Sequence, residues 1–176
     1  MLTNYPNIPE YPFLTLLVSG GHTLILLARS VSSFKILATT VDESIGRTYD
    51  KVGRWLELPW GKLGLGAAME AFCASPLESE WPEGLRPFPD PMKGELGFSY
   101  AALHSHAERF ITNNGGVANL SPENRVAIAR DFQRAAIVQL EEKLGLAFKW
   151  CNDNEVPVRH LVVSGGVASN QYLRDR

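Results

Sequence analysis

Residues 13–26 read FLTLLVSGGHTLIL and predict two strands joined by a tight turn. The apolar run 13–18 and the strand-like run 22–28 flank Ser19-Gly20-Gly21, which therefore falls at the turn of a β-hairpin. Because glycine has no side chain, backbone N–H groups at such a turn can closely approach a phosphate or a carboxylate. The hydroxyls of Ser19 and Thr23 could add donors. Taken alone, such residues more often form a plain hairpin turn.

A second pair of glycines follows another apolar run near the end of the sequence. The run 161–163 predicts a short buried strand that leads through Ser164-Gly165-Gly166 into a helix. Glycines at this point let the backbone lie against a ligand, and the start of the helix supplies a positive dipole end. Asn170, expected one turn into that helix, could then hydrogen-bond a base or a ribose. A plain strand-to-helix connection remains the alternative.

The residues between the two glycine turns predict a mixed α/β domain. Proline-rich segment 75–95 is expected to be irregular, because its prolines forbid regular structure. Ser121-Pro122 has the residues of a helix start, and a buried stripe from Val126 to Ala147 or Phe148 follows at helical spacing. The other expected elements are a strand over 34–40 and helices over 46–58, 67–74, 98–113 and 121–150.

Two carboxylates in the predicted helices are candidates for contacts with a nucleotide. Asp50 could accept hydrogen bonds from both hydroxyls of a ribose, and Glu70 is a second candidate, for which a surface carboxylate is likewise the alternative. The alternative for Asp50 is a surface carboxylate paired with Arg47 or Arg54 along its helix. Asp42 and Glu43 precede the same helix, where they could serve as acids that complement its dipole.

Composition limits the possible functions further. With a formal net charge of −2 over 176 residues, the chain has no cationic excess that would hold a nucleic acid by phosphate neutralisation alone. Its two cysteines form no Cys-x-x-Cys pair, which argues against a disulfide framework or a zinc ribbon. His104 and His106 are two residues apart, so on a helix their side chains point in different directions and cannot coordinate the same metal ion. The sequence has no apolar run long enough for a membrane span and no recognisable targeting segment.

Six stretches in a fixed order resemble the tRNA threonylcarbamoyltransferase family, also called the TsaD or Gcp-like family, of the actin-like ATPase superfamily. They are FLTLLVSGGHTLIL, TTVDESIGRTYDKVGRWLEL, GLGAAMEAF, FSYAALH, AIARDFQRAAIVQL and HLVVSGGVASNQYLRDR. The resemblance implies an α/β, actin-like (ribonuclease-H-like) fold. It also implies transfer of a threonylcarbamoyl group from threonylcarbamoyl-AMP to an adenosine beside the tRNA anticodon.

The same resemblance implies where the nucleotide ligand, threonylcarbamoyl-AMP or ATP, is held. It identifies no catalytic residue in this chain. The implied substrate-binding residues are Leu17, Val18, Ser19, Gly20, Gly21, His22, Asp50, Gly66, Glu70, Gly165, Gly166 and Asn170. The chain departs from the family pattern at Gly46-Arg47, where Gly-Glu is common, at Leu65-Gly66-Ala67, where Gly-Gly-Pro is common, and over 98–104.

The resemblance also implies one divalent metal ion, with its ligands outside this chain. We therefore expect residues 1–176 to form the second half of a Gcp-like domain, with the first subdomain and the C-terminal end lying outside them. A catalytically inactive nucleotide-binding fragment and an actin-like ATPase or kinase remain alternative functions. The expected partners are tRNA and a second copy of the chain, and no membrane. The wording of the motifs is similar to fungal mitochondrial members, with the cytoplasm as the alternative location.

Overall fold

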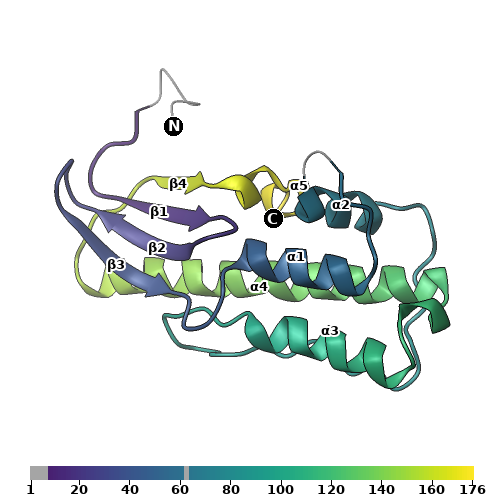
Figure 1. The fold of residues 1–176 in the computed structure, drawn as a ribbon. Coiled ribbons are helices and arrows are strands. Elements are labelled where there is room, and N and C mark those ends of the chain that lie inside the picture. The colour runs from purple at the N-terminus through teal and green to yellow at the C-terminus, as the bar shows by residue number, and fades with distance from the viewer. Residues whose placement is uncertain (1–7, 62–63) are drawn as a thin grey trace.

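A four-stranded sheet forms one end of the molecule (Figure 1). The structure, a computed structural model, describes residues 8–61 and 64–176. The strands lie in the order β3-β2-β1-β4, so the last strand in sequence pairs with the first. The strands are β1 (Phe13–Val18), β2 (Thr23–Ala28), β3 (Phe34–Thr39) and β4 (Leu161–Ser164).

The predicted hairpin is confirmed. β1 and β2 are antiparallel, and Val18 pairs with Thr23 across the glycine turn. β3 pairs antiparallel with the other side of β2, with a register shift between Ile25 and Leu26. β4 is parallel to β1, and Leu17 pairs with Ser164. The carboxyl ends of β1 and β4 therefore point to the same side, toward the helices (Figure 1).

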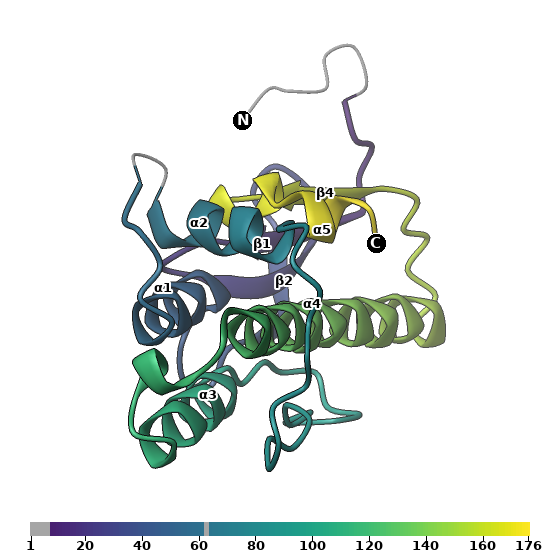
Figure 2. The same ribbon diagram turned by 90° about the vertical axis from the view of Figure 1, so that its right-hand side faces the viewer.

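The helices pack beside the sheet and along one side of it. α4 runs behind the sheet and past α1 in Figure 1, and Figure 2 shows α1 and α4 between α2 on one side and α3 on the other. The α-helices are α1 (Ile45–Trp55), α2 (Gly64–Cys73), α3 (Ala101–Asn113), α4 (Pro122–Asp153) and α5 (Gln171–Arg174), and the short 3-10 helices are η1 (Val117–Asn119) and η2 (Gly166–Ser169).

α4 carries the centre of the hydrophobic core. It begins as predicted, because the Ser121 side chain accepts a hydrogen bond from the Asn124 N–H and Pro122 occupies the first turn. Phe132 is fully buried, and its ring lies 5.0 Å from that of Tyr49 on α1. Of the two alternatives for the end of the stripe, Ala147 is buried and Phe148 is exposed.

The proline-rich segment 75–95 contains no helix or strand, as predicted, and α4 holds it in place. The fully buried Lys143 ammonium donates to the Met92 carbonyl at 2.5 Å and to Glu142 at 2.7 Å. The Gly94 N–H donates to Glu142 at 2.7 Å. The buried ammonium is therefore compensated by a carboxylate and a carbonyl, which is what burial of a charge requires.

The prediction that β4 is a buried strand was wrong. Leu161 and Val163 remain 39% and 43% exposed, whereas their partners Leu14 and Leu16 in β1 are almost fully buried. The reason is the position of β4 at the edge of the sheet among the described residues, where β1 is its one neighbouring strand. Apolar content identified the strand but could not show which side of the sheet is covered.

Asp42 has a different role from the one expected. We predicted an acid that complements the dipole of α1, but its carboxylate accepts hydrogen bonds from the Tyr100 N–H at 2.9 Å, the Ala101 N–H at 3.3 Å and the Ser99 hydroxyl at 2.6 Å. These groups belong to the start of α3, which begins at Ala101 rather than at residue 98. Burial alone would raise the pKa of Asp42, but these hydrogen bonds outweigh it and hold the pKa below its ordinary value of 3.8.

Asp42→Ala should lower the free energy of unfolding by about 0.5–2 kcal/mol at neutral pH, because the start of α3 loses its cap. Since the folded-state pKa is lowered, this contribution is present above pH 3.8 and is lost as the pH falls through the folded-state value. Urea titrations at several pH values should therefore show the difference from the unsubstituted chain shrinking in acid. Asp90→Ala is the control, because Asp90 only approaches Lys93 at 3.9 Å on the surface. An equal loss in both variants would contradict the capping role.

Candidate functional site

The two glycine turns lie side by side at the carboxyl ends of β1 and β4. Their adjacency follows from the parallel pairing of the two strands, whose last paired residues are Leu17 and Ser164. Gly165 then lies directly against Val18: a Cβ added to Gly165 would stand 2.1 Å from the Val18 carbonyl oxygen. Gly165 also has φ +106°, a conformation that L-residues rarely adopt. In open α/β sheets this end of adjacent parallel strands is where ligands usually bind.

The first turn is fixed by the start of α1. A Cβ on Gly46 would stand 2.7 Å from both the Gly20 nitrogen and the Ser19 carbonyl oxygen, so only glycine allows the helix to approach this closely. The Gly46 N–H donates to the Ser19 carbonyl at 3.2 Å, and the Ser44 hydroxyl donates to the Gly20 carbonyl at 2.7 Å. The carbonyls of the turn therefore point toward α1, which leaves the opposite side of these peptides to their N–H groups.

Hydrogen bonds inside the turn restrict which groups remain available. The Ser19 Oγ accepts from the His22 N–H at 2.9 Å and from the Gly21 N–H at 3.2 Å. The buried Thr23 Oγ1 accepts from the Ile45 N–H at 2.8 Å, so Thr23 stabilises the start of α1 rather than facing a ligand, contrary to expectation. The Gly20 N–H has no partner within the described residues, and Gly20 and Gly21 are exposed. Val18 is fully buried and can offer only its backbone.

Asp50 lies on the face of α1 that continues from this turn. It follows Gly46 by one helical turn and precedes Gly53, where an added Cβ would stand 3.2 Å from the Leu65 Cβ at the start of α2. Asp50 is half-buried and forms no hydrogen bond or ion pair within residues 8–61 and 64–176, so the predicted alternative of a pair with Arg47 or Arg54 is absent there. An unpaired carboxylate between the glycine turn and α2 is available to a ligand.

α2 brings Gly66 and Glu70 to the same region. The Glu70 carboxylate accepts the N–H of Gln171 at 2.7 Å and so joins α2 to the first residue of α5. No atom of the described residues lies within 4 Å of the position where a Cβ on Gly66 would be, so the surface there is open to them. The buried Tyr49 of α1 lies close to Cys73 and Glu70 of α2. Burial raises the pKa of Tyr49 well above its ordinary value, with further contributions from Cys73 and the Glu70 carboxylate. The Tyr49 phenol therefore remains neutral.

Asn170 has a different position from the one predicted. It is the N-cap of α5 and does not lie one turn into a helix, because the residues after Gly165 first form the 3-10 helix η2. Its side-chain oxygen accepts from the Leu173 N–H at 2.9 Å, and its amide group lies 3.5 Å from the Gln133 oxygen on α4. Asn170 is 6% exposed, so its side chain orders the segment after the second glycine turn.

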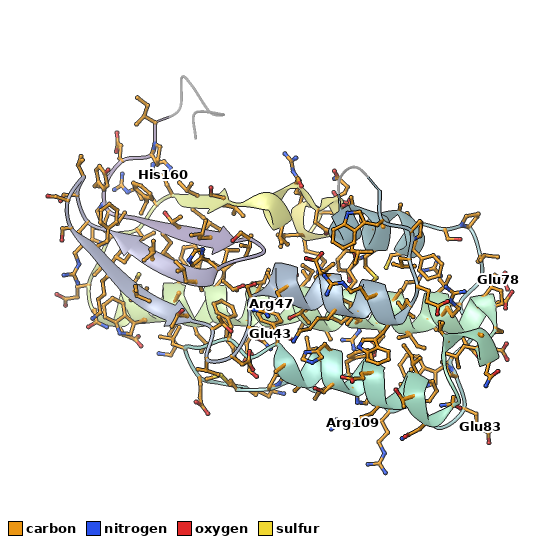
Figure 3. All side chains as sticks on the ribbon, viewed as in Figure 1. Glu43, Arg47, Glu78, Glu83, Arg109 and His160 are labelled. Carbon is orange, nitrogen blue, oxygen red and sulfur yellow. The ribbon has the colours of Figure 1, made fainter. Side chains whose placement is uncertain are left out.

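The described residues contain no group of three or more His, Cys, Asp or Glu side chains placed to hold a metal ion. The histidines of α3 are used elsewhere: the His104 ring hydrogen-bonds the Glu43 carboxylate, and a His106 ring nitrogen lies 2.8 Å from the Arg86 carbonyl. Glu43 also pairs with Lys51. Figure 3 shows Glu43 close to the start of α1, beside Arg47.

The sequence prediction missed Gly46 and Ser44, which fix the first turn. A signal was present, since Ser44 precedes the helical pattern as a capping residue and its side chain accepts from the Arg47 N–H. A glycine near the start of a helix is costly unless something packs against it, which is a further indication of close contact. The partner of Gly46 lies about 25 residues away in the hairpin turn and could not be inferred locally.

Comparison with known proteins adds an independent finding to this geometry. The family model described as TsaD, tRNA N6-adenosine threonylcarbamoyltransferase, matches residues 1–176. The chain belongs to this family. The match therefore confirms the family expected from the six sequence stretches.

Curated relatives agree with this assignment. A protein of Arabidopsis thaliana named probable tRNA N6-adenosine threonylcarbamoyltransferase, mitochondrial, is 38% identical over 95% of this chain and 36% of its own length. Proteins named tRNA N6-adenosine threonylcarbamoyltransferase from Dichelobacter nodosus and Chlamydia felis are 34% and 32% identical over 96% and 94% of this chain, and 45% and 46% of theirs. The chain thus spans less than half the length of these relatives.

A solved structure shows the same fold class. Component A of (R)-2-hydroxyglutaryl-CoA dehydratase from Acidaminococcus fermentans matches with a TM-score of 0.51 at 15% identity, over 97% of this chain and 51% of that chain. The fold is the α/β, actin-like ATPase fold that the sequence predicted. In the part of the chain that the structure describes, no helix combines the length and apolar character of a membrane span.

Two glycine substitutions should change the free energy of unfolding in opposite directions, because Gly165 is tightly packed and Gly66 lies on an open surface of α2. Gly165→Ala should lower the free energy of unfolding by about 2 kcal/mol or more, since its Cβ meets the Val18 carbonyl and its φ is positive. Gly66→Ala should raise it by about 0.4–1 kcal/mol, because the added methyl group meets nothing. Thermal and urea unfolding would measure both. A Gly165→Ala chain as stable as the original would contradict the close contact between the two turns.

Proposed function

We propose that this chain supplies the nucleotide-binding part of a tRNA N6-adenosine threonylcarbamoyltransferase. In the proposed reaction the N6 nitrogen of a tRNA adenosine attacks the carbonyl carbon of threonylcarbamoyl-AMP. The new C–N bond forms as the bond between that carbon and the phosphate oxygen breaks, AMP leaves, and the N6 nitrogen loses a proton. The observation that carries the proposal is the adjacency of the two glycine turns in a chain of this family.

Each group of site residues has a proposed task in holding the adenylate. The turn Ser19–His22 would receive the phosphate, because the Ser19 and Gly20 carbonyls accept hydrogen bonds from the start of α1 and the Gly20 N–H can donate to a phosphate oxygen. Asp50, which has no partner within the described residues, would accept hydrogen bonds from the ribose hydroxyls. Gly165 and Gly166 would leave room for the nucleoside beside the first turn, with Leu17 and Val18 forming the adjoining strand end.

The remaining site residues would act by positioning. Glu70 fixes the start of α5, and Asn170 orders the segment after Gly166, so both would hold the wall of the nucleoside site without touching the reacting atoms. Gly66 would keep the surface of α2 open. Holding the adenylate in one orientation is itself a large part of catalysis, since positioning can contribute about 7–11 kcal/mol to the barrier.

The divalent metal ion implied by the family does not fit the residues present. None of the described acidic, histidine or cysteine side chains form a set that could hold it, so we derive no step through a metal ion. We propose that its ligands lie outside residues 1–176. The threonylcarbamoyl-AMP, the tRNA and a mitochondrial location are likewise proposals for this chain, and the last rests on the name of the Arabidopsis relative.

Asp50→Ala should weaken binding of threonylcarbamoyl-AMP by about 10- to 150-fold, since a charge-assisted hydrogen bond worth roughly 1.5–3 kcal/mol is lost. Titration calorimetry with the adenylate, AMP and ATP would measure this. Folding should be unaffected, because Asp50 holds no other described group.

Glu83→Ala is the matched control for Asp50→Ala. Glu83 is exposed at the end of the molecule opposite the sheet, far from the start of α1 (Figure 3). Equal affinities in the two variants would return Asp50 to the role of a surface acid. Tighter binding of ATP than of the adenylate, with turnover in the absence of RNA, would favour an ATPase or kinase instead.

A further inference from the structure

Two exposed tryptophans flank the end of α1, outside the proposed nucleotide site. Trp55 is 38% exposed and Trp60 is 66% exposed. The Arg54 guanidinium lies 5.7 Å from the centre of the Trp60 ring, within the range of a cation–π contact. Exposed tryptophan rings beside an arginine offer flat apolar faces next to a positive charge, a combination that suits a base and its phosphate.

The surface next to Arg54 and Trp55 is hollow. An open depression of about 400 Å3 lies between the end of α1 and the last turn of α3 with the residues that follow it. Arg54, Trp55 and Glu57 line one side, and Thr112, Gly116 and Val117 line the other. A flat aromatic group of the size of a nucleobase can enter such a depression and still leave its sugar and phosphate in solvent.

Two arginines of α1 are available to an anionic occupant of this region, and one of them, Arg54, lines the depression. Arg47 and Arg54 are seven residues apart on α1, so they share one face of the helix, and neither forms an ion pair within the described residues. Lys51 lies between them but is paired with Glu43. Glu57 is the one acidic side chain that lines the depression. Arginines that are free of acidic partners are available to phosphate groups.

This surface is also placed correctly with respect to the proposed nucleotide site. Gly46 contacts the first glycine turn, and Arg54 follows it by eight residues, or about 12 Å along the helix axis. Arg47, Arg54 and Trp55 therefore lie on the same helix as the proposed nucleotide contacts, and Trp60 follows that helix by five residues. A substrate whose reacting adenosine meets the nucleotide at the start of α1 would extend its neighbouring nucleotides along the same helix.

We propose that Arg54, Trp55 and Trp60, with Arg47 as a further phosphate contact, form a binding surface for unpaired RNA nucleotides, which stack on the tryptophans while the arginines neutralise phosphates. The proposal rests on the proposed function, since an anticodon loop supplies unpaired bases next to the reacting adenosine. A chain with a net charge of −2 needs such a local surface to hold RNA. Stacking of bases on aromatic side chains is the usual mode for single-stranded nucleic acid.

The test measures binding of an anticodon stem-loop RNA by fluorescence anisotropy, without any transfer reaction. Trp60→Ala and Trp55→Ala should each weaken binding by about 5- to 150-fold, the effect of losing one stacked base. Arg54→Gln should reduce the slope of log affinity against log salt by about 1. A fully paired RNA duplex should bind weakly and equally to the unsubstituted chain and both tryptophan variants, because paired bases cannot stack on the protein.

Matched controls come from other surfaces of the chain. Arg109→Gln removes an exposed arginine that points away from α3 into solvent (Figure 3), and Phe148→Ala removes an exposed aromatic ring of α4. Both should bind the stem-loop like the unsubstituted chain. Circular dichroism and urea unfolding would confirm that all variants fold, as expected for exposed side chains.

Three results would overturn the proposal. The first is that the tryptophan variants bind the stem-loop as well as the unsubstituted chain does. The second is that binding falls equally in the control variants. The third is that the chain forms a dimer through this surface, and that Trp60→Ala abolishes the dimer while RNA binding persists. Titration of each variant with threonylcarbamoyl-AMP distinguishes the two proposals. If the tryptophan variants bind the stem-loop normally and the unsubstituted chain binds threonylcarbamoyl-AMP, only the proposal of an RNA surface is contradicted. If the unsubstituted chain does not bind threonylcarbamoyl-AMP, the proposed function itself is contradicted.

Discussion

The parallel pairing of β1 with β4 is the constraint on which the rest of the structure depends. It joins strands that are separated by more than a hundred residues, and it brings their carboxyl ends, each followed by a pair of glycines, into contact. The contact is so close that only glycine fits at position 165, against the Val18 carbonyl. Everything proposed for the nucleotide depends on this pairing, because neither turn alone has enough groups to hold a nucleoside and a phosphate together.

α1 connects that strand pair to the remaining parts of the molecule. One of its faces, marked by Gly46 and Gly53, lies against the hairpin turn and α2, and Asp50 lies between them. Its buried residues, such as Tyr49, contact Phe132 of α4. Its exposed face carries the arginines and leads to Trp55 and Trp60. A single helix of eleven residues therefore carries the proposed ribose contact, part of the core and most of the proposed RNA surface.

The sequence by itself determined the strands, most of the helices and the family. These features depend on neighbours within a few residues: the apolar runs on each side of Ser19-Gly20-Gly21, the Ser121-Pro122 helix start, and the prolines that exclude regular structure from 75–95. Hydrophobic periodicity and turn chemistry act over short distances, which is why they can be detected in one sequence. The order of the six family stretches then indicated that both glycine turns belong to one site.

Only the tertiary structure decided which groups are free and which are already engaged. The oxygens of Asp42 and Thr23 accept hydrogen bonds from the starts of α3 and α1, while Asp50 has no partner within the described residues. Asn170 caps α5, and β4 is exposed because it lies at the edge of the sheet. Each of these outcomes depends on a partner tens of residues away or on the covering of a surface. Such contacts leave no local pattern in the sequence, because they arise from how the elements pack and not from what each element is made of.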